Sequence, residues 1–274
     1  NRRAGCSPLT RKLRSITNKA SAAALIALLL IVWQAVCMMG VVPGFMLPSP
    51  IEVLKAFFED FPVLMSHTGT TLWEAFLGLG IGIALAFCMA FLMDRFRFLY
   101  KAVYPVLVLT QTIPTVAIAP LLVLWMGYDI APKVTLVVIV CFFPVTVGLL
   151  DGFASADPDT VSLLRAMGAS RNQIFRFVQL PASLGRFFSG LPIAVSYSVV
   201  GAVIAEWQGG SNGLGVYMTR VRKSYAFDKM FAVIFLVAIV SLLLMWGVSL
   251  LQKLCMPWER KNALKQEWRG IDKG

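Results

Sequence analysis

The side chains that could carry out catalysis or bind a metal are few and scattered. The chain holds one histidine, His67, and five cysteines that form no CxxC pair. A lone histidine is more often a polar residue near a surface than a catalytic group, and cysteines in apolar stretches behave as small buried hydrophobes. No GxxxxGK[ST] loop occurs, so the chain cannot cradle nucleotide phosphates itself. These residues indicate neither an enzyme nor a metal protein.

A second kind of candidate is the polar residue within a long apolar stretch. Such residues are costly in a bilayer and can line a solute pathway. Serine and threonine can instead satisfy helix backbones or bridge helices, and a glutamate beside tryptophan can be a gate, a docking contact or an interfacial residue. The candidates are Gln111, Thr112, Thr115, Ser196, Tyr197 and Glu206.

The polar segment around Gly168 is a third candidate. Asp157 before Pro158 predicts a capped helix that Gly168 ends, and Ser170 predicts the start of a second short helix that ends near Pro181. Two short helices that meet at a glycine form a compact projection, which could dock into a groove on a partner. A solvated loop that rests on lipid head groups is the alternative.

The elements that must position these residues are membrane spans. The chain has 274 residues, of which 58% are hydrophobic and 14% charged, and its mean hydropathy is +0.76. A soluble domain carries about 25% charged residues. The net charge of +11 lies in short runs between apolar windows. The positive-inside rule explains this pattern better than nucleic-acid binding does.

Six uncharged windows are each long enough to cross a bilayer, which takes about 17 to 25 residues. The sequence therefore predicts an all-α fold with six spans, at about residues 20–40, 70–93, 102–127, 133–152, 187–206 and 230–252 of a membrane domain that covers 20–255. Segment 1–19 precedes them, 256–274 follows, and the loop 154–186 separates the fourth and fifth. Pro105, Pro114 and Pro120 should kink the third.

Two further patterns concern packing and surface. Gly78 and Gly82 form a GxxxG spacing that lets helix backbones approach closely. Residues 51–60 carry apolar side chains at helical spacing, so they predict a short amphipathic helix at the outer surface.

Basic residues set the orientation. With a cytoplasmic amino terminus, 19 of the 25 lysines and arginines fall inside, so both termini are predicted in the cytoplasm. Arg220, Arg222, Lys223 and Lys229 fall outside. They are either tolerated after a fixed span, or they meet acidic residues of a partner protein or anionic lipid.

The segment around Gly168 resembles the coupling motif of permeases from binding-protein-dependent ABC importers. That motif is Glu-Ala-Ala, glycine four residues later, then Ile-x-Leu-Pro. Here Gly168, Val178 and Leu180-Pro181 stand at the family's spacing, while Ser162-Leu163-Leu164 replaces the triplet. The missing acidic residue removes the basis for a salt bridge from that position to an ATPase, but not for docking.

The resemblance covers residues 45–255. Leu47-Pro48-Ser49-Pro50, Gln111 to Pro114, and Glu206-Trp207 with Gly213 to Gly215 are similar to the branch that imports taurine, alkanesulfonates, nitrate and thiamine precursors. The run from Tyr197 to Lys229 looks most like permeases assigned to the pyrimidine precursor of thiamine.

The resemblance implies a multi-pass permease of the bacterial cell membrane, as a homodimer or paired with another permease. Its partners would be two ABC ATPases, which use the ATP and Mg²⁺, and an extracytoplasmic binding protein; this chain would hold no cofactor or metal. The implied ATPase-coupling residues are Ser162, Arg165, Ala166, Gly168, Ala169, Ser170, Arg171, Leu180 and Pro181. The implied docking residues for the binding protein are Arg220, Arg222 and Lys223. A secondary transporter, the main rival, would usually show internal repeats and intramembrane charges.

The predicted topology can be tested by thiol labelling in a background without native cysteines. A cysteine at Ser49 should react with an impermeant reagent added to intact cells, and one at Ser170 should not, because the charge distribution places them on opposite sides. Labelling at Ser170 but not at Ser49 would reverse the orientation.

Overall fold

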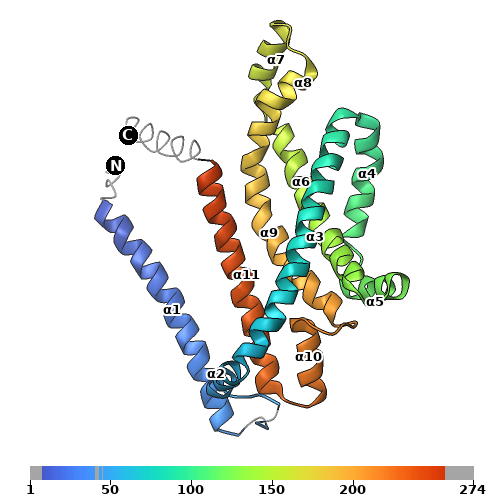
Figure 1. Ribbon diagram of the computed structural model, residues 1–274. Coiled ribbons are helices and arrows are strands. Elements are labelled where there is room, and N and C mark those ends of the chain that lie inside the picture. The colour runs from blue at the N-terminus through green and yellow to red at the C-terminus, as the bar shows by residue number, and fades with distance from the viewer. Residues whose placement is uncertain (1–7, 41–42, 45, 257–274) are drawn as a thin grey trace. The chain divides into compact units, whose positions relative to one another are not determined.

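The computed structural model describes residues 8–40, 43–44 and 46–256, and within these ranges every regular element is a helix (Figure 1). The predicted all-α class is confirmed. Residues 1–7 of the predicted N-terminal segment and 257–274 of the predicted tail lie outside the described residues. The elements are α1 (Pro8–Met38), α2 (Pro50–Glu59), α3 (Phe61–Arg95), α4 (Arg97–Thr110), α5 (Thr115–Met126), α6 (Ile130–Ala154), α7 (Pro158–Ala166), α8 (Arg171–Ile174), η1 (Phe175–Gln179), α9 (Leu180–Glu206), α10 (Leu214–Lys223) and α11 (Phe227–Cys255).

Four described helices are long and apolar enough to cross a membrane. They are α3, α6, the continuous helix Arg171–Glu206 and α11, and they contain the predicted spans 70–93, 133–152, 187–206 and 230–252. The apolar part of α1, Ala24–Met38, is shorter. The count of six spans stays a prediction, because it requires α1 to cross and α4 with α5 to form one crossing.

The predicted kink in the third span is a full break. Helices α4 and α5 meet at an angle of 100° across residues 111–114. Pro114 takes the N-cap position of α5, and a residue before proline is disfavoured in helical conformation, so the chain must turn there. Pro105 and Pro120, which were also expected to kink the span, lie inside α4 and α5.

The described chain falls into two compact units. The larger comprises Pro62–Thr219 and the described residues from Ile234 onward. In it α3, α6 and α9 share one apolar core, and small residues bring their backbones together. A Cβ added to Gly78 of α3 would lie 2.5 Å from Val137 Cβ of α6, and one added to Gly152 of α6 would lie 2.7 Å from the Ser183 backbone of α9. The predicted packing role of Gly78 is therefore confirmed, with α6 as the partner.

The smaller unit holds the described residues up to Phe61 together with Arg220–Val233. The amphipathic helix predicted at 51–60 is α2. It begins with a capping box between Ser49 and Glu52, and it turns Val53 and Ala56 inward while Leu54 and Phe58 are exposed. Its C-cap residue Asp60 forms an ion pair of 2.7 Å with Lys229. Lys229 is therefore engaged within this unit.

Packing at Gly78 predicts a contrast between two neighbouring glycines. Gly78→Val should lower the thermal unfolding midpoint in detergent, because an overpacked core costs about 1–3 kcal/mol. Gly80→Val should leave the midpoint nearly unchanged, since a Cβ at Gly80 has no neighbour within 4 Å. Equal midpoints for the two variants would contradict the close contact between α3 and α6.

Candidate functional site

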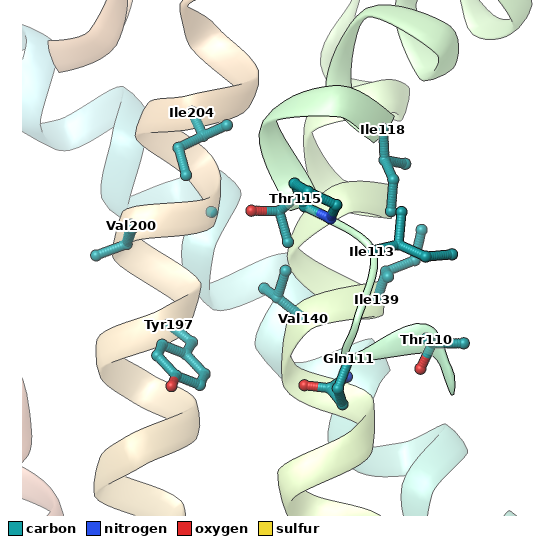
Figure 2. Close-up of a pocket in the computed structure, with 12 residues that line it drawn as sticks. Thr110, Gln111, Ile113, Thr115, Ile118, Ile139, Val140, Tyr197, Val200 and Ile204 are labelled. Carbon is teal, nitrogen blue, oxygen red and sulfur yellow. The ribbon is translucent and has the colours of Figure 1, made fainter. Parts of the chain in front are cut away.

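A cavity of about 300 Å³ opens beside the break between α4 and α5 (Figure 2). Its walls come from the break, from α5, from α6 and from α9. On α9 the lining residues recur at helical spacing, so one face of that helix forms a continuous wall. The cavity is lined by Thr110, Gln111, Ile113, Pro114, Thr115, Ile118, Ile139, Val140, Tyr197, Val200, Gly201 and Ile204.

Three of the six predicted pathway residues lie at this cavity: Gln111, Thr115 and Tyr197. Figure 2 shows Gln111 from the break and Tyr197 from α9 on facing walls, with Thr115 at the start of α5. Each carries a neutral hydrogen-bonding group, and no lining residue is charged. The cavity can therefore hold a small solute with polar edges and an apolar body. The apolar lining residues were missed, because nothing in their type marks them.

The other three predicted pathway residues are elsewhere. The Thr112 hydroxyl donates to the Leu109 carbonyl at 2.8 Å, which satisfies the frayed end of α4. Ser196 is half-buried and does not line the cavity. Glu206 is 1% exposed. The Thr112 contact is of the backbone-satisfying kind, and its place in a pathway stays a prediction.

Glu206 is the centre of a buried hydrogen-bond cluster, which none of the roles predicted from the sequence included. Its Oε1 accepts from the Thr71 hydroxyl of α3 at 2.7 Å, and its Oε2 accepts from the Gly215 amide at 2.6 Å. Thr71 Oγ1 also accepts from the Leu214 amide at 2.9 Å. His67 Nδ1 accepts from the Gly213 amide at 2.9 Å, and the His67 side chain is buried.

Glycines make this cluster possible. Gly209, Gly210 and Gly213 have φ of 150°, 136° and 126°, which other residues rarely adopt. A Cβ at Gly213 or Gly215 would also collide with the Glu206 side chain. The amides of Gly213 and Leu214 thus hold this segment against α3, and the glycine positions have no space for a larger residue.

A buried ion pair lies close by. Lys133 Nζ of α6 contacts Glu74 Oε1 of α3 at 2.6 Å, and the two side chains are 7% and 4% exposed. This pair was not predicted from the sequence, because Lys133 entered only the distribution of basic residues. Its only sequence signal is a lysine in the first turn of a strongly apolar helix. Within the described ranges, no three His, Cys, Asp or Glu side chains are placed to hold a metal ion together.

Helices α7 and α8 form the predicted projection, which precedes the N-terminal end of α9 (Figure 1). Asp157 caps α7, with Pro158 in its first turn, and Ser170 forms a capping box with Gln173 at the start of α8. Gly168 between them has φ of 83°. The Thr160 hydroxyl, at 2.6 Å, and the amides of residues 159 and 160 donate to Asp157 and lower its pKa. This cap is therefore ionised at neutral pH, and its contribution is lost only as the pH falls below the ordinary carboxyl range.

The predicted coupling residues divide into two groups. Ser162, Arg165, Ala166, Gly168 and Ser170 are exposed on the projection, and Ala169 is half-buried. Leu180 and Pro181 are instead in the first turn of α9. The second short helix was predicted to end near Pro181, which is wrong: the helix continues to Glu206 through η1. Leu163 and Met167, 62% and 74% exposed, were missed as surface residues, although their i, i+4 spacing could have indicated a shared face.

Arg171 differs from the other predicted coupling residues in where its side chain points. Its guanidinium donates to the Asp94 carbonyl near the end of α3, at 2.7 Å. It therefore ties the projection to the body of the larger unit.

The basic cluster at 220–223 forms the last turn of α10. Arg220, Arg222 and Lys223 are exposed there. Cations in the last turn of a helix are favoured by its macrodipole. The helix macrodipole is thus a third explanation for the three basic residues, beside a tolerated charge and a contact with a partner or lipid. Docking of a partner protein stays a prediction.

Long apolar helices, a broken helix beside a cavity and a helical projection define a membrane transport subunit. Residues 78–257 match the family model described as "Binding-protein-dependent transport system inner membrane component", and the chain belongs to this family. It is thus a permease subunit of an ABC importer, as the motif around Gly168 predicted.

Known permeases are similar in sequence to this chain over most of its length. The "Probable ABC transporter permease protein" of Haemophilus influenzae is 37% identical, over 82% of this chain and 92% of its own length. The "Formylaminopyrimidine transport permease protein ThiX" of Halalkalibacterium halodurans is 34% identical, over 86% and 94%. Permeases named for aliphatic sulfonates, taurine and nitrate also match, which confirms the predicted branch.

Among solved structures, an amino acid ABC transporter crystallised with histidines matches with a TM-score of 0.57. It is 17% identical and covers 72% of this chain and 94% of that one. At this identity the match supports the fold alone.

Burial of Glu206 predicts a structural defect on its removal. Glu206→Ala leaves the buried Gly215 amide without its acceptor, and an unsatisfied buried group costs about 1–3 kcal/mol. The Thr71 hydroxyl would keep only its 3.2 Å contact with the His67 carbonyl. The thermal unfolding midpoint in detergent should therefore fall. Glu59→Ala is the control, because this carboxylate is 57% exposed in a surface pair worth at most about 1 kcal/mol. A midpoint for Glu206→Ala as high as that of Glu59→Ala would contradict the cluster.

Proposed function

We propose that this permease works with a second permease subunit, two ABC ATPases and an extracytoplasmic binding protein to import a small uncharged solute. The projection at residues 157–174 carries the assignment to an ATPase-driven machine. It exposes the apolar side chains of Leu163 and Met167 beside Arg165, a combination suited to a groove on a partner protein.

The division of labour follows from the chemistry of the chain. With no phosphate-binding loop here, ATP and Mg²⁺ belong on the ATPase subunits, and the projection receives their movement. The positive-inside distribution favours a cytoplasmic projection and cytoplasmic termini. The same distribution places Arg220, Arg222 and Lys223 outside, where they can meet acidic side chains of the binding protein and raise the rate of encounter.

The cavity beside the α4–α5 break is proposed as part of the translocation pathway. Its polar side chains include Gln111, Thr115 and Tyr197, each able to exchange hydrogen bonds with a passing solute, while the Thr110 hydroxyl donates to the Leu107 carbonyl. Irregular backbone at membrane depth is tolerated where it lines a cavity, which suits the break at 111–114. Alternate opening would move this interrupted wall against the continuous wall of α9.

A pyrimidine precursor of thiamine is the substrate class that we favour. Two observations support it: the likeness to a formylaminopyrimidine permease over 86% of the chain, and a cavity without charged lining residues. Sulfonates and nitrate are anions, for which a charged or strongly donating wall would be expected. A neutral heterocycle needs apolar faces and a few neutral hydrogen-bonding groups.

The function can be tested in proteoliposomes that contain the permease, its ATPase and its binding protein. Labelled formylaminopyrimidine should accumulate only with hydrolysable ATP, and excess taurine should not compete. Gly168→Leu should lower both uptake and the linked ATP hydrolysis, since a side chain at φ of 83° costs about 1–3 kcal/mol and distorts the turn between α7 and α8.

Gly168→Asn is the matched control, because asparagine tolerates positive φ better than leucine does. It should retain most of the uptake, since a Cβ at this position has no neighbour within 4 Å. Wild-type rates in Gly168→Leu would overturn the coupling role of the turn. Uptake of taurine in place of the pyrimidine would overturn the substrate class alone.

A further inference from the structure

The helix that leaves the projection contains one irregular turn, η1, at Phe175–Gln179. It is a π-helical turn, in which the Leu180 amide donates to the Phe175 carbonyl five residues earlier. Pro181 has no amide hydrogen, so it cannot continue the regular ladder, and the wider turn carries the helix past it. Turns of this kind are rare in proteins and occur frequently at functional sites.

Phe175, the first residue of this turn, lies between two other phenylalanines. Its ring centroid is 4.9 Å from that of Phe91 on α3 and 5.2 Å from that of Phe153 on α6, and both contacts are edge-to-face. Phe91 and Phe153 stand near the ends of their helices, which close at Arg95 and Ala154. A single side chain of the helix below the projection thus touches two spans at once.

Two further contacts, one on each side of η1, attach the projection and α9 to the neighbouring helices. On the membrane side of η1, Ser183 packs on Gly152 so closely that a Cβ at Gly152 would lie 2.7 Å from it. This contact pins α9 to α6. On the other side of η1, the single hydrogen bond from Arg171 to the Asp94 carbonyl reaches α3. Phe175 stands between the fixed point and the projection, where a tilt presses its ring against Phe91 and Phe153.

We propose that Phe175 is the positioning residue that passes displacement of the projection to the ends of α3 and α6. The inference rests on the proposed docking of the projection to an ATPase. What this proposal adds is the path of the displacement. The path runs through the aromatic contact of Phe175 beneath the projection, and the π-helical turn η1 is the hinge that lets the ring move. Phe177, two residues along and 68% exposed, takes no part in this route.

A purely structural role for Phe175 as a packed core residue predicts a different result. Loss of core packing would lower stability and the amount of complex, but it would leave the coupling between ATP hydrolysis and the transport cycle unchanged in the complexes that form. The measurement must therefore report coupling in each assembled complex, and not yield or rate alone.

The experiment uses the complete complex in nanodiscs and measures ATP hydrolysis with and without excess binding protein. Phe175→Leu keeps an apolar side chain but removes the ring edges, so it should lower the ratio of stimulated to basal hydrolysis about fivefold or more. Phe175→Tyr keeps the ring and should retain the ratio. Phe177→Leu, in the same turn, should behave as wild type.

The route also predicts non-additivity. Phe91→Leu should reproduce part of the loss from the α3 side, and adding it to Phe175→Leu should lower the ratio by less than the product of the two single effects, because the partners share one contact. If Phe175→Leu fails to reach the membrane, Phe91→Leu and Phe175→Tyr test the same contact.

The other possible results distinguish a failure of the proposed Phe175 contact from a failure of ATPase docking. An unchanged ratio in Phe175→Leu overturns the route, as does a loss equal to that of Phe177→Leu. Failure of the ATPase to copurify with Phe175→Leu, while it copurifies with wild type, makes the residue a docking determinant and also overturns the route. Failure of the ATPase to copurify with the wild-type permease would instead overturn the proposed function.

Discussion

Lipid acyl chains form no hydrogen bonds, so polar groups that the fold removes from water must find partners within the protein. Regular helices meet this demand for most of the described backbone. Where the chain departs from a helix, side chains or special residues supply the missing partners. Glu206, Thr71 and His67 accept hydrogen bonds from the amides of residues 213–215, and the Thr112 hydroxyl satisfies the last turn of α4. At these two places, side chains compensate for the irregular backbone.

The same demand explains why charge is kept away from the cavity. Lys133 and Glu74 neutralise one another at 2.6 Å, buried between α3 and α6, and Glu206 is held by a hydroxyl and an amide. These groups hold helices and a glycine-rich segment together, so they are not free to meet a solute. The cavity wall is left with neutral groups. A mutation that removed one partner of these buried groups would leave the other without its partner and would disturb the fold.

Close packing at glycines gives the larger unit a stiff part and a movable part. Gly78 and Gly152 bring α3 and α9 against α6 with no space for a side chain, which makes these three helices one packed body. The break between α4 and α5 and the turn η1 interrupt helices at the cavity and below the projection. Because packed helices resist deformation, bending would cost least at such interruptions. Helix α9 joins both regions, since its one face lines the cavity and its first turns leave the projection.

Much of this protein was predictable from local sequence, because local sequence carries the relevant physics. The uncharged windows determine which helices can lie in lipid, Asp157 and Ser170 determine where two short helices begin, and the spacing around Gly168 indicates the family. Gln111, Thr115 and Tyr197 could be proposed as pathway residues because polar side chains in apolar windows are conspicuous.

What the sequence by itself could not decide was which polar residues face a cavity and which are buried partners. Thr112, Ser196 and Glu206 look equally suitable along the chain, and Lys133 looks like a loop charge. Their roles depend on contacts with residues tens of positions away, such as Thr71 with Glu206 and Glu74 with Lys133, and only the packing of α3 against α6 and α9 brings those residues within hydrogen-bond distance.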